Sequence, residues 1–77
     1  MIIDLILNRK EGDAYNPKTF YNDVERYACY WSEMCRPILE ALDEGEESDV
    51  KRALVNYITE FEYNPEIIPY INSVNWL

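Results

Sequence analysis

The clearest alternation of apolar and polar positions lies in residues 49–61. Apolar side chains recur there at intervals of three and four residues: Val50, Ala53, Leu54, Tyr57, Ile58 and Phe61. This spacing places them on one face of an α-helix, with charged and polar residues opposite. Because an isolated amphipathic helix is marginal in water, the apolar face must pack on the rest of the chain. We therefore predict a helix over 49–61 near the centre of the fold.

A second amphipathic pattern starts at Asn16-Pro17. Asn is a favoured N-cap, and Pro suits the first position of a helix because its missing N–H leaves no bond unmade. Apolar residues then follow at helical spacing: Phe20, Val24, Tyr27, Ala28 and Trp31. The pattern predicts a helix over 17–31.

Residues 32–44 continue with a third set of apolar positions: Cys35, Ile38, Leu39 and Leu42. Pro37 interrupts the backbone ladder if it lies deep inside a helix. We therefore expect this helix to begin near Ser32 or Arg36, after a bend, with Pro37 in its first turn. Gly45 should end it, and Ser48 or a neighbour should cap the central helix.

The first residues read MIIDLIL, which fits either a buried helix or a short buried strand. Helix is favoured because no second segment offers itself as a pairing strand. The basic residues and the glycine within residues 8–12 are typical of a helix C-terminus.

The last part of the chain repeats the cap-plus-proline start at Asn64-Pro65. A short helix should follow, which Pro69 delays or bends, with these apolar positions: Ile67, Ile68, Ile71 and Val74. The apolar Trp76-Leu77 segment should dock on the core, because exposing it would forgo its burial.

Together these patterns predict an all-α fold. We expect one compact domain, residues 1–77, in which four to five short helices form a bundle. The predicted core comprises Ile3, Ile6, Phe20, Val24, Tyr27, Trp31, Ile38, Leu39, Leu42, Val50, Leu54, Tyr57, Ile58, Phe61, Ile68 and Ile71.

Charge narrows the classes of partner. The formal net charge of −8 argues against direct nucleic-acid binding, which needs cationic side chains to displace counterions. It also argues against docking on an anionic membrane surface. A basic protein partner is compatible with this charge, although solubility alone also accounts for it.

The two cysteines do not suit a disulfide. On a continuous helix Cys29 and Cys35 would point in different directions about 9 Å apart along the axis. Cys29 should be the more exposed of the two, since it lies opposite the apolar face. With no signal peptide or membrane-spanning run in view, a reducing cytoplasm is the expected location.

The inventory for catalysis and metal binding is poor. The chain has no His, so the commonest general base and metal ligand is absent. Two glycines cannot build a phosphate-binding loop, and no Ser or Cys lies in a nucleophile motif. We expect no enzymatic activity, no catalytic residues, no cofactor and no metal.

Two sets of residues are candidates for an interaction surface. The first is a run of acids: Glu40, Asp43, Glu44, Glu46, Glu47 and Asp49. It is either a solvated turn or a ridge that meets a basic protein, and its glycine does not fit the EF-hand pattern. The second set is aromatic residues outside the predicted core, of which Tyr15, Tyr63, Tyr70 and Trp76 are the main candidates. They either cover the ends of a small core or anchor an interface, including that of a homodimer.

The motifs at 49–54, 57–58, 63–67 and 70–76 together resemble small acidic proteins encoded on conjugative or other mobile elements of Gram-positive gut bacteria. The resemblance spans nearly the whole chain and implies a cytoplasmic accessory role, with no activity or site residues attached. The leading hypothesis is a non-enzymatic module that binds a protein partner or itself. The alternative is an acidic DNA mimic that inhibits a nucleic-acid-handling defence protein.

Overall fold

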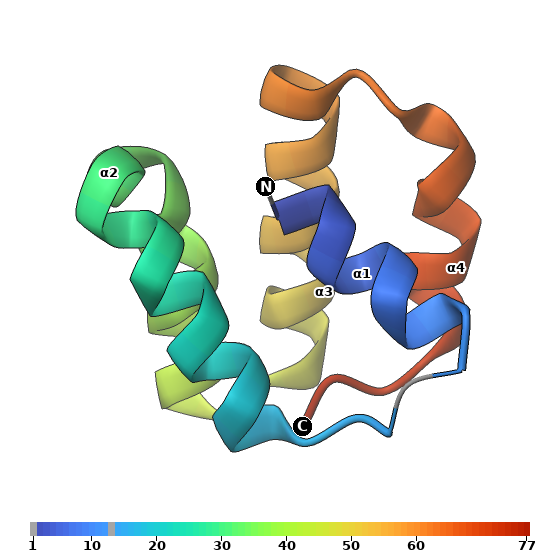
Figure 1. Ribbon diagram of the computed structural model, residues 1–77, viewed down its shortest axis with the longest axis horizontal. Helices are drawn as coiled ribbons and strands as arrows, with labels where there is room; N and C mark the ends of the chain where they lie inside the picture. Colours follow the sequence, from blue (N-terminus) through green and yellow to red (C-terminus); the bar gives the residue numbers. More distant parts are fainter. Residues whose placement is uncertain (1, 13) are drawn as a thin grey trace.

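Helices make up all the regular structure of the described residues. The computed structural model describes residues 2–12 and 14–77, without the side chains of 28–32. The order is α1 (Ile2–Lys10), α2 (Pro17–Glu44), α3 (Glu47–Tyr57), a π-helical turn η1 (Ile58–Glu62), a 3-10 turn η2 (Pro65–Ile67) and α4 (Ile68–Ser73) (Figure 1). The predicted all-α fold is confirmed.

Local chemistry sets both ends of α2 as the sequence predicts. The Asn16 side chain accepts hydrogen bonds from the backbone N–H of Lys18, at 2.9 Å, and from that of Thr19. At the other end Gly45 adopts a left-handed φ of 78° and its N–H donates to the Ala41 carbonyl. For α3, where Ser48 or a neighbour was the predicted cap, the cap falls at Glu46, and it makes no side-chain capping bond.

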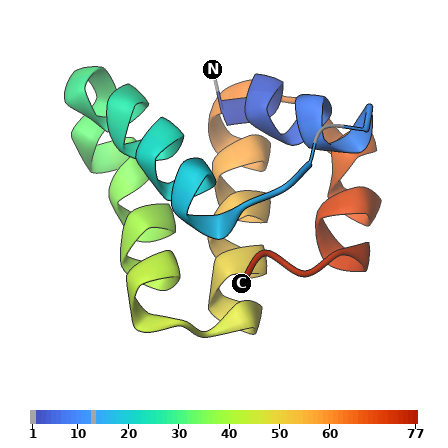
Figure 2. The same ribbon diagram turned by 60° about the horizontal axis from the view of Figure 1, so that its bottom comes forward.

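Helix α2 is one continuous helix that folds back on itself. A straight α-helix of its 28 residues would be about 42 Å long. The whole molecule measures only 26 × 25 × 21 Å, so the helix must bend sharply. Figures 1 and 2 show two arms that meet in a V at the green middle of the helix. We call residues 17–32 the first arm and residues 33–44 the second arm.

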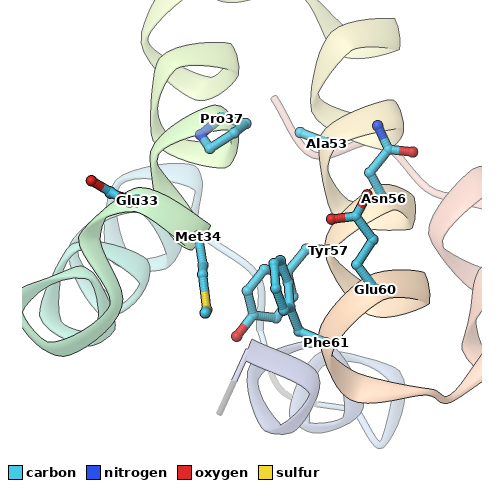
Figure 3. Close-up of a pocket in the computed structure, with 8 residues that line it drawn as sticks. All are labelled: Glu33, Met34, Pro37, Ala53, Asn56, Tyr57, Glu60 and Phe61. Atoms are coloured by element: carbon cyan, nitrogen blue, oxygen red, sulfur yellow. The ribbon is translucent and has the colours of Figure 1, made fainter.

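The predicted boundary between separate helices at 31 and 32 is therefore wrong, although a bend is present. Pro37 lies inside the helix rather than in a first turn. Its ring crowds the carbonyl of Glu33, which also loses its usual N–H partner. The helix changes direction at Glu33 and Met34, one turn before the proline (Figure 3). Pro37 thus bends a helix that we expected it to start.

Helix α3 lies between α2 and α4 (Figure 2). It contacts both neighbours, and α1 packs on α2. The central place predicted for residues 49–61 is confirmed. No helix in the described residues combines the length and apolarity that a bilayer crossing requires.

Every α-helix and both short turns contribute to the core. The buried apolar side chains are Ile2, Ile6, Phe20, Val24, Cys35, Ile38, Ala41, Val50, Leu54, Tyr57, Ile58, Ile67, Ile71 and Trp76. Several predicted core residues are only half-buried, namely Ile3, Tyr27, Leu39, Leu42 and Ile68. The predicted burial of Trp31 falls on a side chain outside the described residues.

Phe61 is a clear departure from the predicted core, because 38% of it is exposed. The π-helical turn is the physical cause. Its i→i+5 bonding fits more residues into each turn than an α-helix does, so each residue advances by a smaller angle. Phe61 therefore lags behind the apolar face that Val50, Leu54 and Ile58 share.

Candidate functional site

An open groove runs between the second arm of α2 and α3. Its volume is about 470 Å³, and it is lined by Glu33, Met34, Pro37, Ala53, Asn56, Tyr57, Glu60 and Phe61 (Figure 3). The first three come from α2 and the others from α3 and η1. The bend in α2 and the π-turn after α3 therefore both shape this groove.

The inner wall of the groove is apolar. Met34 projects towards the rings of Tyr57 and Phe61, and Pro37 faces Ala53 (Figure 3). The two aromatic rings pack with centroids 5.2 Å apart. Met34 is 37% exposed and Phe61 38%, so both present large apolar surface to water. In a domain this small, adjoining apolar surface of this kind marks a candidate binding site.

Tyr57 in the groove lining and the buried Cys35 near it both keep their protons at neutral pH. Burial, and next the negative charge of Glu62, raise the pKa of the Tyr57 phenol to about 12. The same two causes raise the pKa of the Cys35 thiol. One oxygen of Glu62, Oε1, is buried without a hydrogen-bond partner among the described residues. A protonated, buried thiol is a poor nucleophile, so Cys35 offers packing here rather than reactivity.

The groove continues along the same helix pair into a shallower stretch of about 230 Å³. Both stretches share Pro37, Ala53 and Asn56. The continuation adds further carboxylates to the lining: Glu40, Glu44 and Asp49. Acidic side chains therefore border the groove on both helices.

The predicted acidic run does not act as one uniform surface. Glu40, Asp43, Glu44 and Glu46 are exposed, as a solvated turn or ridge requires. Asp49 is half-buried and lies 3.8 Å from the Arg52 guanidinium. Because that pair is well exposed to water, its contribution to stability is small.

Glu47 departs from this run because its carboxylate is occupied inside the molecule. Oε1 accepts the backbone N–H of Trp76 at 2.6 Å, and Oε2 accepts that of Leu77 at 2.9 Å. One carboxylate thus binds consecutive N–H groups of the last segment with charge-assisted hydrogen bonds. The prediction that Glu47 belongs to a free interaction surface is wrong, because its carboxylate is bonded inside the molecule.

Trp76 was also wrongly predicted as a surface anchor, because it is 0% exposed. Its indole N–H donates to the Ile71 carbonyl at 3.0 Å. Its ring meets Tyr15 edge-on at 5.6 Å, Phe20 at 5.2 Å and Tyr70 edge-on at 6.4 Å. The expected docking of the last segment on the core is confirmed.

The remaining candidate tyrosines divide between this cluster and the surface. Tyr15 is half-buried, its hydroxyl donates to the Trp76 carbonyl at 2.6 Å, and burial raises its pKa. Tyr70 is half-buried against Trp76. Tyr63 alone among these candidates is well exposed, at 81%, and has a left-handed φ of 51°.

Arg9 completes the Trp76 cluster in a way that the sequence did not predict. Its guanidinium carbon lies 4.0 Å from the centroid of the Tyr15 ring and 4.7 Å from that of Trp76. One guanidinium nitrogen is buried without a hydrogen-bond partner among the described residues. The faces of the aromatic rings supply part of the interaction that a carboxylate would otherwise provide.

Cys35 is a free, buried thiol, in agreement with the prediction that it forms no disulfide. Whether Cys29 is the more exposed cysteine stays a prediction, because its side chain lies outside the described residues. Among the side chains that the structure describes, no group of three or more His, Cys, Asp or Glu is placed to hold a metal ion.

Sequence reasoning missed the groove itself, because none of its lining residues from the first stretch was a candidate. The available signal was Met34, a large apolar residue beside the buried Cys35 and off the apolar face of its helix. Comparison with known proteins adds no assignment: no family model, curated protein or solved structure matches the chain.

Proposed function

We propose that the chain is a non-enzymatic interaction module that binds a protein partner through the groove between the second arm of α2 and α3. The single observation that carries the proposal is the pairing of Met34 and Phe61. These large apolar side chains, more than a third exposed, meet across a groove of about 470 Å³. Burying them against a partner would recover free energy that the isolated chain forgoes.

The partner in this proposal is a different protein rather than a second copy. A symmetric dimer would place the same groove surface of both copies together. Glu33 and Glu60 line that surface, so the contact would bring like charges face to face. The wider net charge of −8 adds to the repulsion. The proposal places the module in the cytoplasm, in the accessory role that its resemblance implies.

The DNA-mimic alternative stays a prediction, because no observation specifically favours it. It requires carboxylates that are free and spread along one face. Glu47, one member of the run on which it depends, is bound to backbone N–H groups. The groove offers apolar surface, which a phosphate-like surface does not need.

The test compares partner retention by matched variants. Immobilised wild type, Met34→Ser/Phe61→Ser and a surface control, Tyr63→Ser, are incubated with lysate of the cells that encode the chain. The proposal expects a protein that the wild type and the control retain and that the groove variant loses. Circular dichroism shows that all three remain helical. A protein retained equally by all three would contradict the groove as the binding site.

Sedimentation of the purified chain tests the second part of the proposal. A monomer at concentrations up to about 100 µM is expected. A dimer that Met34→Ser/Phe61→Ser dissociates would assign the groove to self-association instead.

A further inference from the structure

The groove is long enough for a helix. Its two stretches join at Pro37 and Ala53, so it runs from Phe61 at one end to Asp49 at the other. At 1.5 Å per residue this part of α3 and η1 spans about 18 Å, or about three helical turns. In Figure 3 no described segment lies across its opening. A third helix lying alongside the pair is the natural occupant of such a site.

The side chains along the groove vary in size in a way that suits this occupant. Its middle includes small or flat residues, namely Ala41, Ala53 and Pro37, beside the polar Asn56. Helices approach most closely where the contact residues are small. At one end Met34 and Phe61 offer flexible and aromatic surface. A helix would therefore lie close to the middle and place a large apolar residue against Met34 and Phe61.

The rims select the charge of the occupant. Glu33, Glu40 and Glu44 line the groove from α2, while Asp49 and Glu60 line it from α3 and η1. Of the described residues that line either stretch, Arg52 is the only base, and it lies 3.8 Å from Asp49. A helix in the groove would hold its polar face beside these carboxylates, where positive side chains are favoured and negative ones are repelled.

We propose that the groove binds a basic amphipathic helix of about three turns, with its apolar face against Met34 and Phe61 and its Lys or Arg side chains beside the acidic rims. This inference rests on the proposed function and specifies its partner. Apolar contact supplies affinity, and the acidic rims exclude helices whose polar face is negatively charged.

The first test uses three synthetic peptides that share one apolar face. The polar face carries Lys in the first, Glu in the second and Gln in the third. Fluorescence anisotropy measures the Kd, and circular dichroism measures the helicity that the peptide gains. The Lys peptide is expected to bind at least about tenfold more tightly than the Gln peptide and to become helical. The Glu peptide should not bind.

The second test separates the groove from general attraction to an acidic protein. The triple variant Glu40→Gln/Glu44→Gln/Glu60→Gln removes three rim charges. The control Asp43→Asn/Glu46→Gln/Glu66→Gln removes three charges outside the groove lining. All six side chains are exposed, so both variants should fold. The rim variant should weaken binding of the Lys peptide about tenfold, and the control less than about twofold.

Each of the other outcomes contradicts either this inference or the proposed function. Equal weakening by the two triple variants would show attraction to net charge alone, and equal binding of the Gln peptide would show that the rims do not select a basic helix. Either result overturns this inference. If no peptide binds while Met34→Ser/Phe61→Ser still loses the cellular partner, the basic helix is wrong and the proposed function stands. If that variant also keeps the partner, both fail.

Discussion

The Trp76 cluster and the α2–α3 groove contain similar large apolar side chains, but the cluster buries them and the groove leaves them partly exposed to water. In the cluster the indole packs on Tyr15 and Phe20, its N–H is bonded, and it is 0% exposed. In the groove Phe61 packs on Tyr57, yet 38% of it faces water beside an exposed methionine. Aromatic content alone therefore does not decide which large side chains are buried and which stay exposed. The two regions differ in whether other segments of the same chain cover the aromatic rings.

Removing the indole should give the largest loss of stability. Trp76→Ala leaves a cavity between Tyr15 and Phe20 and removes the bond to Ile71, so the free energy of unfolding should fall by about 3–5 kcal/mol. That is close to the whole stability that the core of so small a domain supplies. Urea unfolding followed by circular dichroism measures it. A loss below about 1 kcal/mol would show that the Trp76 cluster is not a major contributor to the stability of the fold.

High pH should weaken the region where core and groove meet. The Tyr57 phenol has an ordinary pKa of 10.0 and a folded-state pKa of about 12. Below pH 10 the phenol is protonated in both states, so its contribution is intact. As pH rises from 10 to 12 the unfolded chain loses this proton first, and stability falls by at most about 3 kcal/mol.

Tyr57→Phe isolates that contribution. The variant should lose less stability than the wild type between pH 9 and 12, while the raised pKa of Tyr15 affects both proteins alike. Urea midpoints across this range provide the comparison. Parallel pH profiles for wild type and variant would contradict the burial of the Tyr57 hydroxyl.

Loss of the Glu47 carboxylate should have an intermediate effect. Glu47→Ala leaves the N–H groups of Trp76 and Leu77 without their acceptor and should lower the free energy of unfolding by about 2 kcal/mol. The neighbouring Glu46→Ala removes an exposed acid and should change it by less than about 0.5 kcal/mol. Thermal melts of both variants measure this difference in stability. Equal melting temperatures would contradict a stabilising role for the Glu47 carboxylate.

The smallest effect is expected on the groove side. Phe61→Ser should cost about 1 kcal/mol or less, since much of the ring is already in water. Phe20→Ser is the matched change in the cluster, where the ring is 5% exposed, and should cost about 3–5 kcal/mol. Similar losses in the two variants would mean that Phe61 is a core residue after all.

Local chemistry made much of the fold predictable. The caps at Asn16 and Gly45 act on neighbouring residues, and the face shared by Val50, Leu54 and Ile58 follows from helical spacing alone. These features need no knowledge of where other segments lie. The sequence pattern was sufficient for them, and for the all-α class.

The candidate site was not predictable in the same way. The π-turn moves Phe61 off its expected face, and the bend at Pro37 decides which residues of α2 meet α3. Trp76 was a surface candidate because its partners Arg9 and Tyr15 lie at the other end of the sequence. Contacts of such range depend on the closed fold and leave no periodic signal in the chain.

The position of Trp76 also has a consequence for synthesis. The ribosome makes α1, α2 and α3 before residue 76 exists, so Arg9, Tyr15 and Phe20 must wait for the side chain that covers them. Throughout that interval the nascent chain would present apolar surface to chaperones and proteases. Cooperative closure of the cluster would then follow the synthesis of residue 76, and the formation of α1, α2 and α3 alone would not complete it.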